Sequence, residues 1–204
     1  MDHVSLVVAD TKVSALLGAW SRPLTRSKSD AIIRLSGSGA GAINMAIKQG
    51  WTGRVFEDFD VGDVYEHPLG RTIHPADNTW FTLLTMNTNP VHFDAAYAAR
   101  TEFGKPLVNS CLTLAIVTGQ SVTDLSQNAI ANLGWDDVRL PHPVFEGDTI
   151  YARSEVLETR ESKSRPHAGI VKVRSTGVNQ DGTPVIEFTR TFMVWKRGYV
   201  PKGR

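Results

Sequence analysis

A long apolar segment near the middle of the chain reads SCLTLAIVTGQSVTDL, from Ser110 to Leu125. Leu112, Ile116 and Val117 recur in it at helical spacing, and its apolar residues occupy too wide an arc for a surface stripe. We therefore predict a central helix over 110–125 that is largely buried, with Ile116 in the core. We also expect Cys111 to be a small buried hydrophobe rather than a nucleophile.

Strand-like segments follow this helix at 151–158, 168–178 and 185–196, and the run Asn-Gln-Asp-Gly at 179–182 predicts a turn between the last two. A helix followed by a meander of long strands indicates an α+β fold in which an antiparallel sheet wraps around one central helix. Upstream of the helix, residues 60–72 predict an opening strand.

A second informative run is Asn87-Thr88-Asn89-Pro90-Val91-His92, which follows a short predicted helix beginning at Pro75. Proline fixes its own φ and pushes Asn89 toward an extended conformation, so the chain bends into a defined turn that presents Asn87 and His92. Asp94, just after the turn, is typical of a helix N-cap. We interpret Asn89 as holding the turn together through its side chain.

The run from Asn87 to His92 resembles the Asp-x-Asn-Pro-x-His motif of the MaoC-like (R)-specific enoyl-CoA hydratases, with Asn at the position of the catalytic Asp. Residues 104–110, GKPLVNS, and 143–148, PVFEGD, resemble further segments of that family in the expected order. Short strings at 84–87 and 132–139 are most similar to the branch that acts on C5 dicarboxylic thioesters such as mesaconyl-CoA or itaconyl-CoA. The resemblance covers about residues 54–197 and implies the hotdog fold.

The resemblance implies a hydro-lyase that adds water across the 2,3 double bond of an acyl thioester. His92 is the expected acid and base, because an imidazole takes and returns protons near neutral pH. Backbone N–H groups of Ser110 and Cys111, at the start of the central helix, are the expected oxyanion donors. We predict no metal and no cofactor apart from the coenzyme A of the substrate.

Asn87 is a departure from the motif, because a carboxamide can hold a water molecule but cannot act as a base. Either His92 works alone as acid and base while Asn87 orients the water, or the site binds thioesters without hydrating them. We favour the first interpretation. A non-catalytic thioester-binding subunit is the alternative, and a hotdog thioesterase is a weaker one, since the helix has no carboxylate before Asp124.

A dicarboxylic acyl group requires a cation near its far carboxylate, and Arg71, Lys105 and Arg139 are the candidates for substrate binding, together with Asn89. Each cation is equally compatible with a solvated charge on a strand or loop. The sequence leaves the acyl chain open.

The chain has 204 residues and a net charge of +1, which gives no indication of nucleic-acid binding. It has one cysteine, which excludes an intrachain disulfide framework, and no apolar run approaches the roughly 20 residues of a membrane span. Its start, Met-Asp-His, lacks the basic region of a signal peptide, so we expect a cytoplasmic protein.

Residues 1–52 are rich in glycine and hydroxyl side chains, and we predict an N-terminal arm there, followed by the hotdog domain at 53–198 and a short tail at 199–204. A single hotdog sheet leaves one edge open, so we expect a homodimer or a higher homo-oligomer.

Overall fold

The computed structural model describes residues 48–201. The helices of this part are η2 (Phe56–Asp58), α2 (Pro75–Leu84), η3 (Pro90–His92), α3 (Ala95–Ala98), α4 (Ser110–Gln120) and the π-helical turn η4 (Val122–Ser126). The strands are β1 (Val64–Glu66), β2 (Arg71–Thr72), β3 (Ala129–Arg139), β4 (Thr149–Glu161), β5 (Ala168–Val178) and β6 (Pro184–Trp195).

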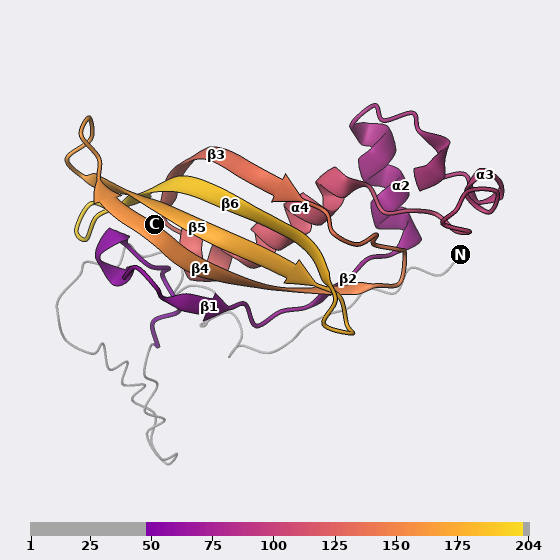
Figure 1. Cartoon of the computed structure of the whole chain (residues 1–204). Helices are drawn as coiled ribbons and strands as arrows, with labels where there is room; N and C mark the ends of the chain where they lie inside the picture. Colours follow the sequence, from indigo (N-terminus) through magenta and orange to yellow (C-terminus); the bar gives the residue numbers. More distant parts are fainter. Residues whose placement is uncertain (1–47, 202–204) are drawn as a thin grey trace, which may run out of the picture. The chain divides into compact units, whose positions relative to one another are not determined.

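The strands form an antiparallel sheet in the order β1-β4-β5-β6-β3, with β2 paired to β4 beside β1. Helix α4 lies along one face of this sheet, while α2 and α3 lie near the start of α4 (Figure 1). The predicted α+β hotdog arrangement, an antiparallel sheet wrapped around a central helix, is confirmed.

Strands β4, β5 and β6 are long because they supply the inner face of the sheet. Along β4 the buried positions alternate as Ile150, Ala152, Ser154 and Val156, the period expected of a strand with one covered face. The predicted turn at 179–182 joins β5 to β6, with the Gly182 N–H bonded to the Asn179 carbonyl at 3.0 Å.

Two elements differ from the prediction. The expected strand over 60–72 is interrupted between β1 and β2, where Pro68 lacks an N–H for strand pairing. Strand β3 was not predicted, because it lies at the sheet edge and most of its side chains are exposed, which removes the alternation that marks a strand.

The prediction that the central helix is largely buried is wrong for the described part of the chain. Leu112 and Val117 pack into the core against the sheet and Thr113 is buried, but the opposite face of α4 is open, and Cys111 is exposed rather than buried. The reason is geometric: the sheet covers only one side of the helix. Ile116 is accordingly half-buried and packs against the edge of the core.

Close approach between α4 and the sheet depends on Gly177 of β5. A Cβ atom at this position would lie 2.7 Å from a Val117 methyl and 2.8 Å from an Ile186 methyl. Only glycine leaves space for the helix there.

The end of α4 lies over a buried arginine. Arg190 of β6 is 1% exposed and donates from one terminal nitrogen to the Ser121 hydroxyl at 3.0 Å, which donates to the Thr118 carbonyl at 2.7 Å. Burial lowers the pKa of Arg190 to about 10. The cation therefore sits at the negative end of the helix dipole, a favourable position for it.

A chain of hydrogen-bonded side chains, buried except at Asp124, ties four segments together. His67, after β1, bonds through Nδ1 to Asp124 of η4 at 2.9 Å and through Nε2 to Ser154 of β4 at 3.0 Å. The Ser154 hydroxyl bonds to that of Ser175 in β5 at 2.8 Å. This polar chain attaches strands β4 and β5 to η4.

The predicted arm lies almost wholly outside the described residues, as do the last three residues of the predicted tail. Trp51, at the end of the predicted arm, donates from its indole nitrogen to the Thr123 carbonyl at 3.0 Å. Within residues 48–201, no helix combines the length and apolar character needed to cross a membrane.

Candidate functional site

The turn that carries Asn87 and His92 begins where α2 ends. The Asn87 N–H bonds to the Thr82 carbonyl at 3.0 Å and the Met86 N–H bonds to the Leu83 carbonyl at 3.1 Å, the paired pattern of a Schellman C-terminus. Met86 occupies the left-handed position of this motif, with φ of 59°, where glycine is usual. The helix end thus sets where Asn87 leaves α2.

Two successive side-chain turns follow. The Asn87 Oδ1 accepts the Asn89 N–H at 3.0 Å, and the Asn89 Oδ1 accepts the Val91 N–H at 3.2 Å, so that Asn89 caps η3. The interpretation of Asn89 as a turn-holding residue is confirmed. Asp94 likewise caps α3, accepting the Tyr97 N–H at 2.9 Å.

His92 is 8% exposed, and its Nδ1 lies 2.8 Å from the carbonyl oxygen of Leu107. Because a carbonyl oxygen can only accept, Nδ1 must carry a hydrogen, and in the neutral imidazole the free lone pair is on Nε2. The structure therefore selects Nε2 as the basic atom of His92.

The start of α4 is capped by Asn109, a residue the sequence analysis did not single out. Its Oδ1 accepts the Cys111 N–H at 3.0 Å, while the Leu112 and Thr113 N–H groups bond to its carbonyl. The Ser110 N–H has no hydrogen-bond partner within residues 48–201. The prediction is corrected for Cys111, whose N–H is occupied, so we retain Ser110 alone as the candidate oxyanion donor.

Asn78 of α2 is the second residue missed. It is fully buried, and its carboxamide contacts the His92 turn, the residues before α4 and the turn at 145–148. The signal for it in the sequence is a carboxamide three residues before Phe81, on the same side of the helix predicted to begin at Pro75.

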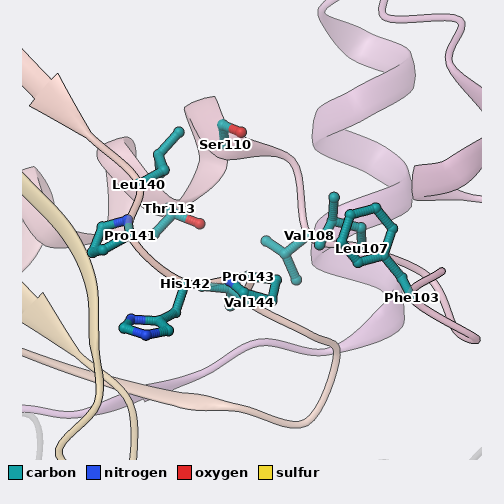
Figure 2. Close-up of a pocket in the computed structure, with 10 residues that line it drawn as sticks. All are labelled: Phe103, Leu107, Val108, Ser110, Thr113, Leu140, Pro141, His142, Pro143 and Val144. Atoms are coloured by element: carbon teal, nitrogen blue, oxygen red, sulfur yellow. The ribbon is translucent and has the colours of Figure 1, made fainter.

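A cavity of about 260 Å³ lies beside the start of α4 (Figure 2). Its wall is mainly apolar, with the hydroxyls of Ser110 and Thr113 as polar groups. The His142 ring points away from these hydroxyls and its Nδ1 bonds to the Pro184 carbonyl at 2.8 Å. The lining residues are Phe103, Leu107, Val108, Ser110, Thr113, Leu140, Pro141, His142, Pro143 and Val144.

The three candidate cations differ in how they are engaged. Arg71 is paired with Asp77 at 2.7 Å. Lys105 lies 4.3 Å above the ring of Phe145, which in turn neighbours the cavity residue Phe103. Arg139 directly precedes the cavity residue Leu140 and donates only to the Val138 carbonyl at 3.3 Å, among the described residues. Lys105 and Arg139 are therefore connected to residues at the cavity, whereas the Arg71 guanidinium is engaged by Asp77.

The Asp77 carboxylate also caps α2. Its Oδ2 accepts the His74 N–H at 2.8 Å, and this backbone bond, assisted by Arg71, lowers the pKa of Asp77. Both oxygens of the Asp77 carboxylate are thus engaged at the start of α2.

A sequence model of the family described as mesaconyl-CoA hydratase matches residues 43–202. The chain is 37% identical over 145 residues to a β-methylmalyl-CoA dehydratase from Chloroflexus aurantiacus, and 34% identical over 145 residues to a mesaconyl-CoA hydratase from Cereibacter sphaeroides. Each match covers 71% of this chain but only 41% and 42%, respectively, of the two relatives. The match thus spans less than half of the length of these curated relatives.

Among solved structures, a Mycobacterium tuberculosis protein with a double hotdog fold is 25% identical to the chain, with a TM-score of 0.67. The superposition covers 74% of this chain and 47% of that protein. The chain therefore corresponds to one of two hotdog units there.

Proposed function

Because the chain belongs to the mesaconyl-CoA hydratase family of MaoC-like dehydratases, we propose that it hydrates the 2,3 double bond of an enoyl-CoA thioester. The observation that carries this proposal is the His92 tautomer. With Nδ1 donated to the Leu107 carbonyl, Nε2 is free to take a proton from water.

The reaction needs a base, an oxyanion donor and an acid, and His92 serves as both base and acid. Nε2 of His92 removes a proton from water as the oxygen bonds to C3, and the electron pair of the double bond moves toward the thioester carbonyl. The free Ser110 N–H, at the positive end of α4, stabilises the oxygen of that carbonyl as charge builds on it. The proton on His92 then passes to C2, which completes the addition without any oxidant or reductant.

Asn87 orients the water in this proposal. One lone pair of its Oδ1 is used by the Asn89 N–H, which leaves the other lone pair and the two Nδ2 hydrogens for a water molecule. His92 is then the single acid and base, because a carboxamide does not titrate.

For the substrate we propose a C5 dicarboxylyl-CoA of the mesaconyl or itaconyl type. Support comes from the names of the two curated relatives and from the apolar cavity, which suits a short branched acyl chain. Lys105 and Arg139 are the proposed partners of the far carboxylate, with Arg71 less well placed because it is paired with Asp77. Coenzyme A enters as part of this substrate.

For the partner we propose a second copy of this chain, making a homodimer. The open face of α4 and strand β3 enclose an apolar groove of about 430 Å³ that includes Cys111, Leu114, Gly119 and Trp135. Covering an apolar groove of this size and the adjacent edge strand with a second copy of the chain would remove apolar surface and unpaired strand groups from water, which is favourable. Light scattering at micromolar concentration tests this, and a monomeric mass would contradict it.

The activity is tested with crotonyl-CoA and mesaconyl-CoA, following loss of the enoyl absorbance and release of free thiol. We expect loss of absorbance without thiol release. His92→Ala should lower kcat by roughly 10² to 10⁴ with little change in KM, the usual scale for loss of general acid–base help. His167→Ala is the control, because this histidine stacks on the Trp195 ring at 5.1 Å and lines neither the cavity nor the groove beside α4.

Asn87→Asp is the informative second variant. It places a titrating carboxylate where this chain has a carboxamide of the same size, so it should retain activity and change the pH profile. Thiol release would indicate a thioesterase instead, and binding without turnover would indicate a thioester-binding subunit. Full activity of His92→Ala would show that the proposed site is wrong.

A further inference from the structure

One buried carboxamide connects the two halves of the candidate site. Asn78 is 0% exposed, and its Nδ2 donates to the His92 carbonyl at 2.7 Å and to the Leu107 carbonyl at 3.2 Å. A third acceptor, the Glu146 carboxylate, lies 3.2 Å from the same nitrogen. The Oδ1 of Asn78 accepts the Asn109 N–H at 2.9 Å.

The contact with Leu107 bears on the base. The Leu107 carbonyl oxygen accepts from Asn78 on one side and from Nδ1 of His92 at 2.8 Å on the other, so both of its lone pairs are used. The Asn78 side chain therefore fixes the direction of the carbonyl that selects the His92 tautomer. The second bond, to the His92 carbonyl, fixes the backbone of the same residue.

The contact with Asn109 bears on the oxyanion donor. Asn109 caps α4, and its own N–H is held by Asn78, so the residue directly before Ser110 cannot shift without breaking this bond. One planar group thus sets the positions of both the His92 ring and the Ser110 N–H.

We propose that Asn78 is a positioning residue that holds Nε2 of His92 and the N–H of Ser110 in one mutual geometry. The catalytic consequence rests on the proposed hydratase function. Reacting groups need placement to within a fraction of an ångström, and a displacement of about 1 Å can lower a rate by about 10²-fold.

The residue must be asparagine because the site needs a donor and an acceptor on one short side chain. Aspartate would lose the donor and would put a second carboxylate beside Glu146. An apolar side chain would leave the Asn109 N–H and the His92 carbonyl without a partner in the interior.

Asn78→Asp tests the proposal, with Asn128→Asp as the matched control. Asn128 also donates from Nδ2 to two backbone carbonyls, those of Thr52 at 2.9 Å and Arg54 at 3.0 Å, but touches neither candidate catalytic group. We expect Asn78→Asp to lower kcat by about 10- to 100-fold while KM stays within about threefold. Asn128→Asp should leave both constants within about twofold.

A double variant separates positioning from a general loss of structure. In a His92→Ala background, Asn78→Asp should lower the residual rate by a clearly smaller factor than in the wild-type background, because one of the two groups that it positions is already absent. The same 10- to 100-fold loss in both backgrounds would overturn the proposal, as would an unchanged kcat in the single variant.

The ring ¹⁵N signals of His92 provide a test that needs no substrate. The wild-type protein should show the Nδ1–H tautomer alone, and Asn78→Asp, or Asn78→Ser if the first variant does not fold, should show a mixture. The wild-type chain itself should show a coupling between the Asn78 amide and the His92 carbonyl carbon, and its absence would refute the proposal even if neither variant folds. If the wild type hydrates no enoyl-CoA, the proposed function fails, while these signals still decide the role of Asn78.

Discussion

Replacing Met86 by glycine should stabilise the protein, although it removes a side chain. Met86 holds the left-handed position of the α2 terminus with φ of 59°, and its side chain is 86% exposed. The left-handed conformation costs a non-glycine residue about 1–2 kcal/mol. The extra backbone entropy of glycine offsets about 0.5–1 kcal/mol of the relief, and little apolar burial is lost. The net expectation is a gain of about 0.5–1 kcal/mol.

Met86→Ala is the control, since alanine removes most of the side chain but keeps the Cβ atom that causes the strain. Urea unfolding of the three proteins at one concentration gives the free energies, and equal slopes show that only stability has changed. For a chain of this size the gain corresponds to about 1–4 °C in Tm. If Met86→Gly is no more stable than Met86→Ala, the strain argument at this helix end is wrong.

Three further experiments, with four substitutions, test the packing and the cap of α2. Ile150→Ala, at a fully buried position, should lower the free energy of unfolding in urea by about 2–5 kcal/mol. Ile116→Ala should lower it by only about 1–2 kcal/mol, because that side chain is half-buried. Equal losses for the two variants would contradict the open face of α4. Gly177→Ala should lower the free energy of unfolding by about 1–3 kcal/mol, because the added methyl would meet Val117. An unchanged Tm in thermal unfolding would refute the close approach of α4 to β5. The lowered pKa of Asp77 adds stability above about pH 4 that is lost as the pH falls, so wild type should lose more unfolding free energy than Asp77→Asn between pH 5 and about pH 2; parallel losses would argue against the cap.

The elements that could be predicted from the sequence are those in which local pattern and tertiary burial agree. The central helix, strands β4 to β6 and the turn at 179–182 have strong periodicity or turn chemistry, and all are present. The helix at 110–125 was extended too far: the α-helix ends at Gln120 and a π-helical turn follows, a change in hydrogen bonding that side-chain spacing does not reveal.

The missing pieces depend on contacts between distant segments. Strand β3 follows no burial pattern because only its pairing with β6 makes it a strand. The exposure of Cys111 depends on which side of α4 the sheet covers, which an apolar sequence cannot specify. Asn78 and Asn109 meet across 31 residues of chain, so neither could be assigned a role from its neighbours in sequence.

At the site, the sequence motif located His92 and Asn87, but not how they are engaged. The choice of Nε2 as the basic atom follows from the Leu107 carbonyl, 15 residues away. The occupied N–H of Cys111 follows from the side chain of Asn109, two residues before it. The motif therefore located the candidate residues of the turn, and the tertiary structure determines the direction of their hydrogen bonds.

The hydrogen-bonded chain from Asp124 through His67 to Ser154 and Ser175 has acid, imidazole and hydroxyl in the order that hydrolases use to activate a nucleophile. Here both hydroxyls are sealed, at 0% and 2% exposure, so no thioester can reach them and a reagent for activated serines has no target among these groups. The carboxylate can only accept, which makes Nδ1 of His67 a donor and, in the neutral ring, makes Ser154 the donor to Nε2. In the neutral ring every proton of the chain therefore points toward Asp124, and an amide nitrogen in place of that oxygen would reverse all three bonds, with Nε2 donating to Ser154 and Ser154 donating to Ser175.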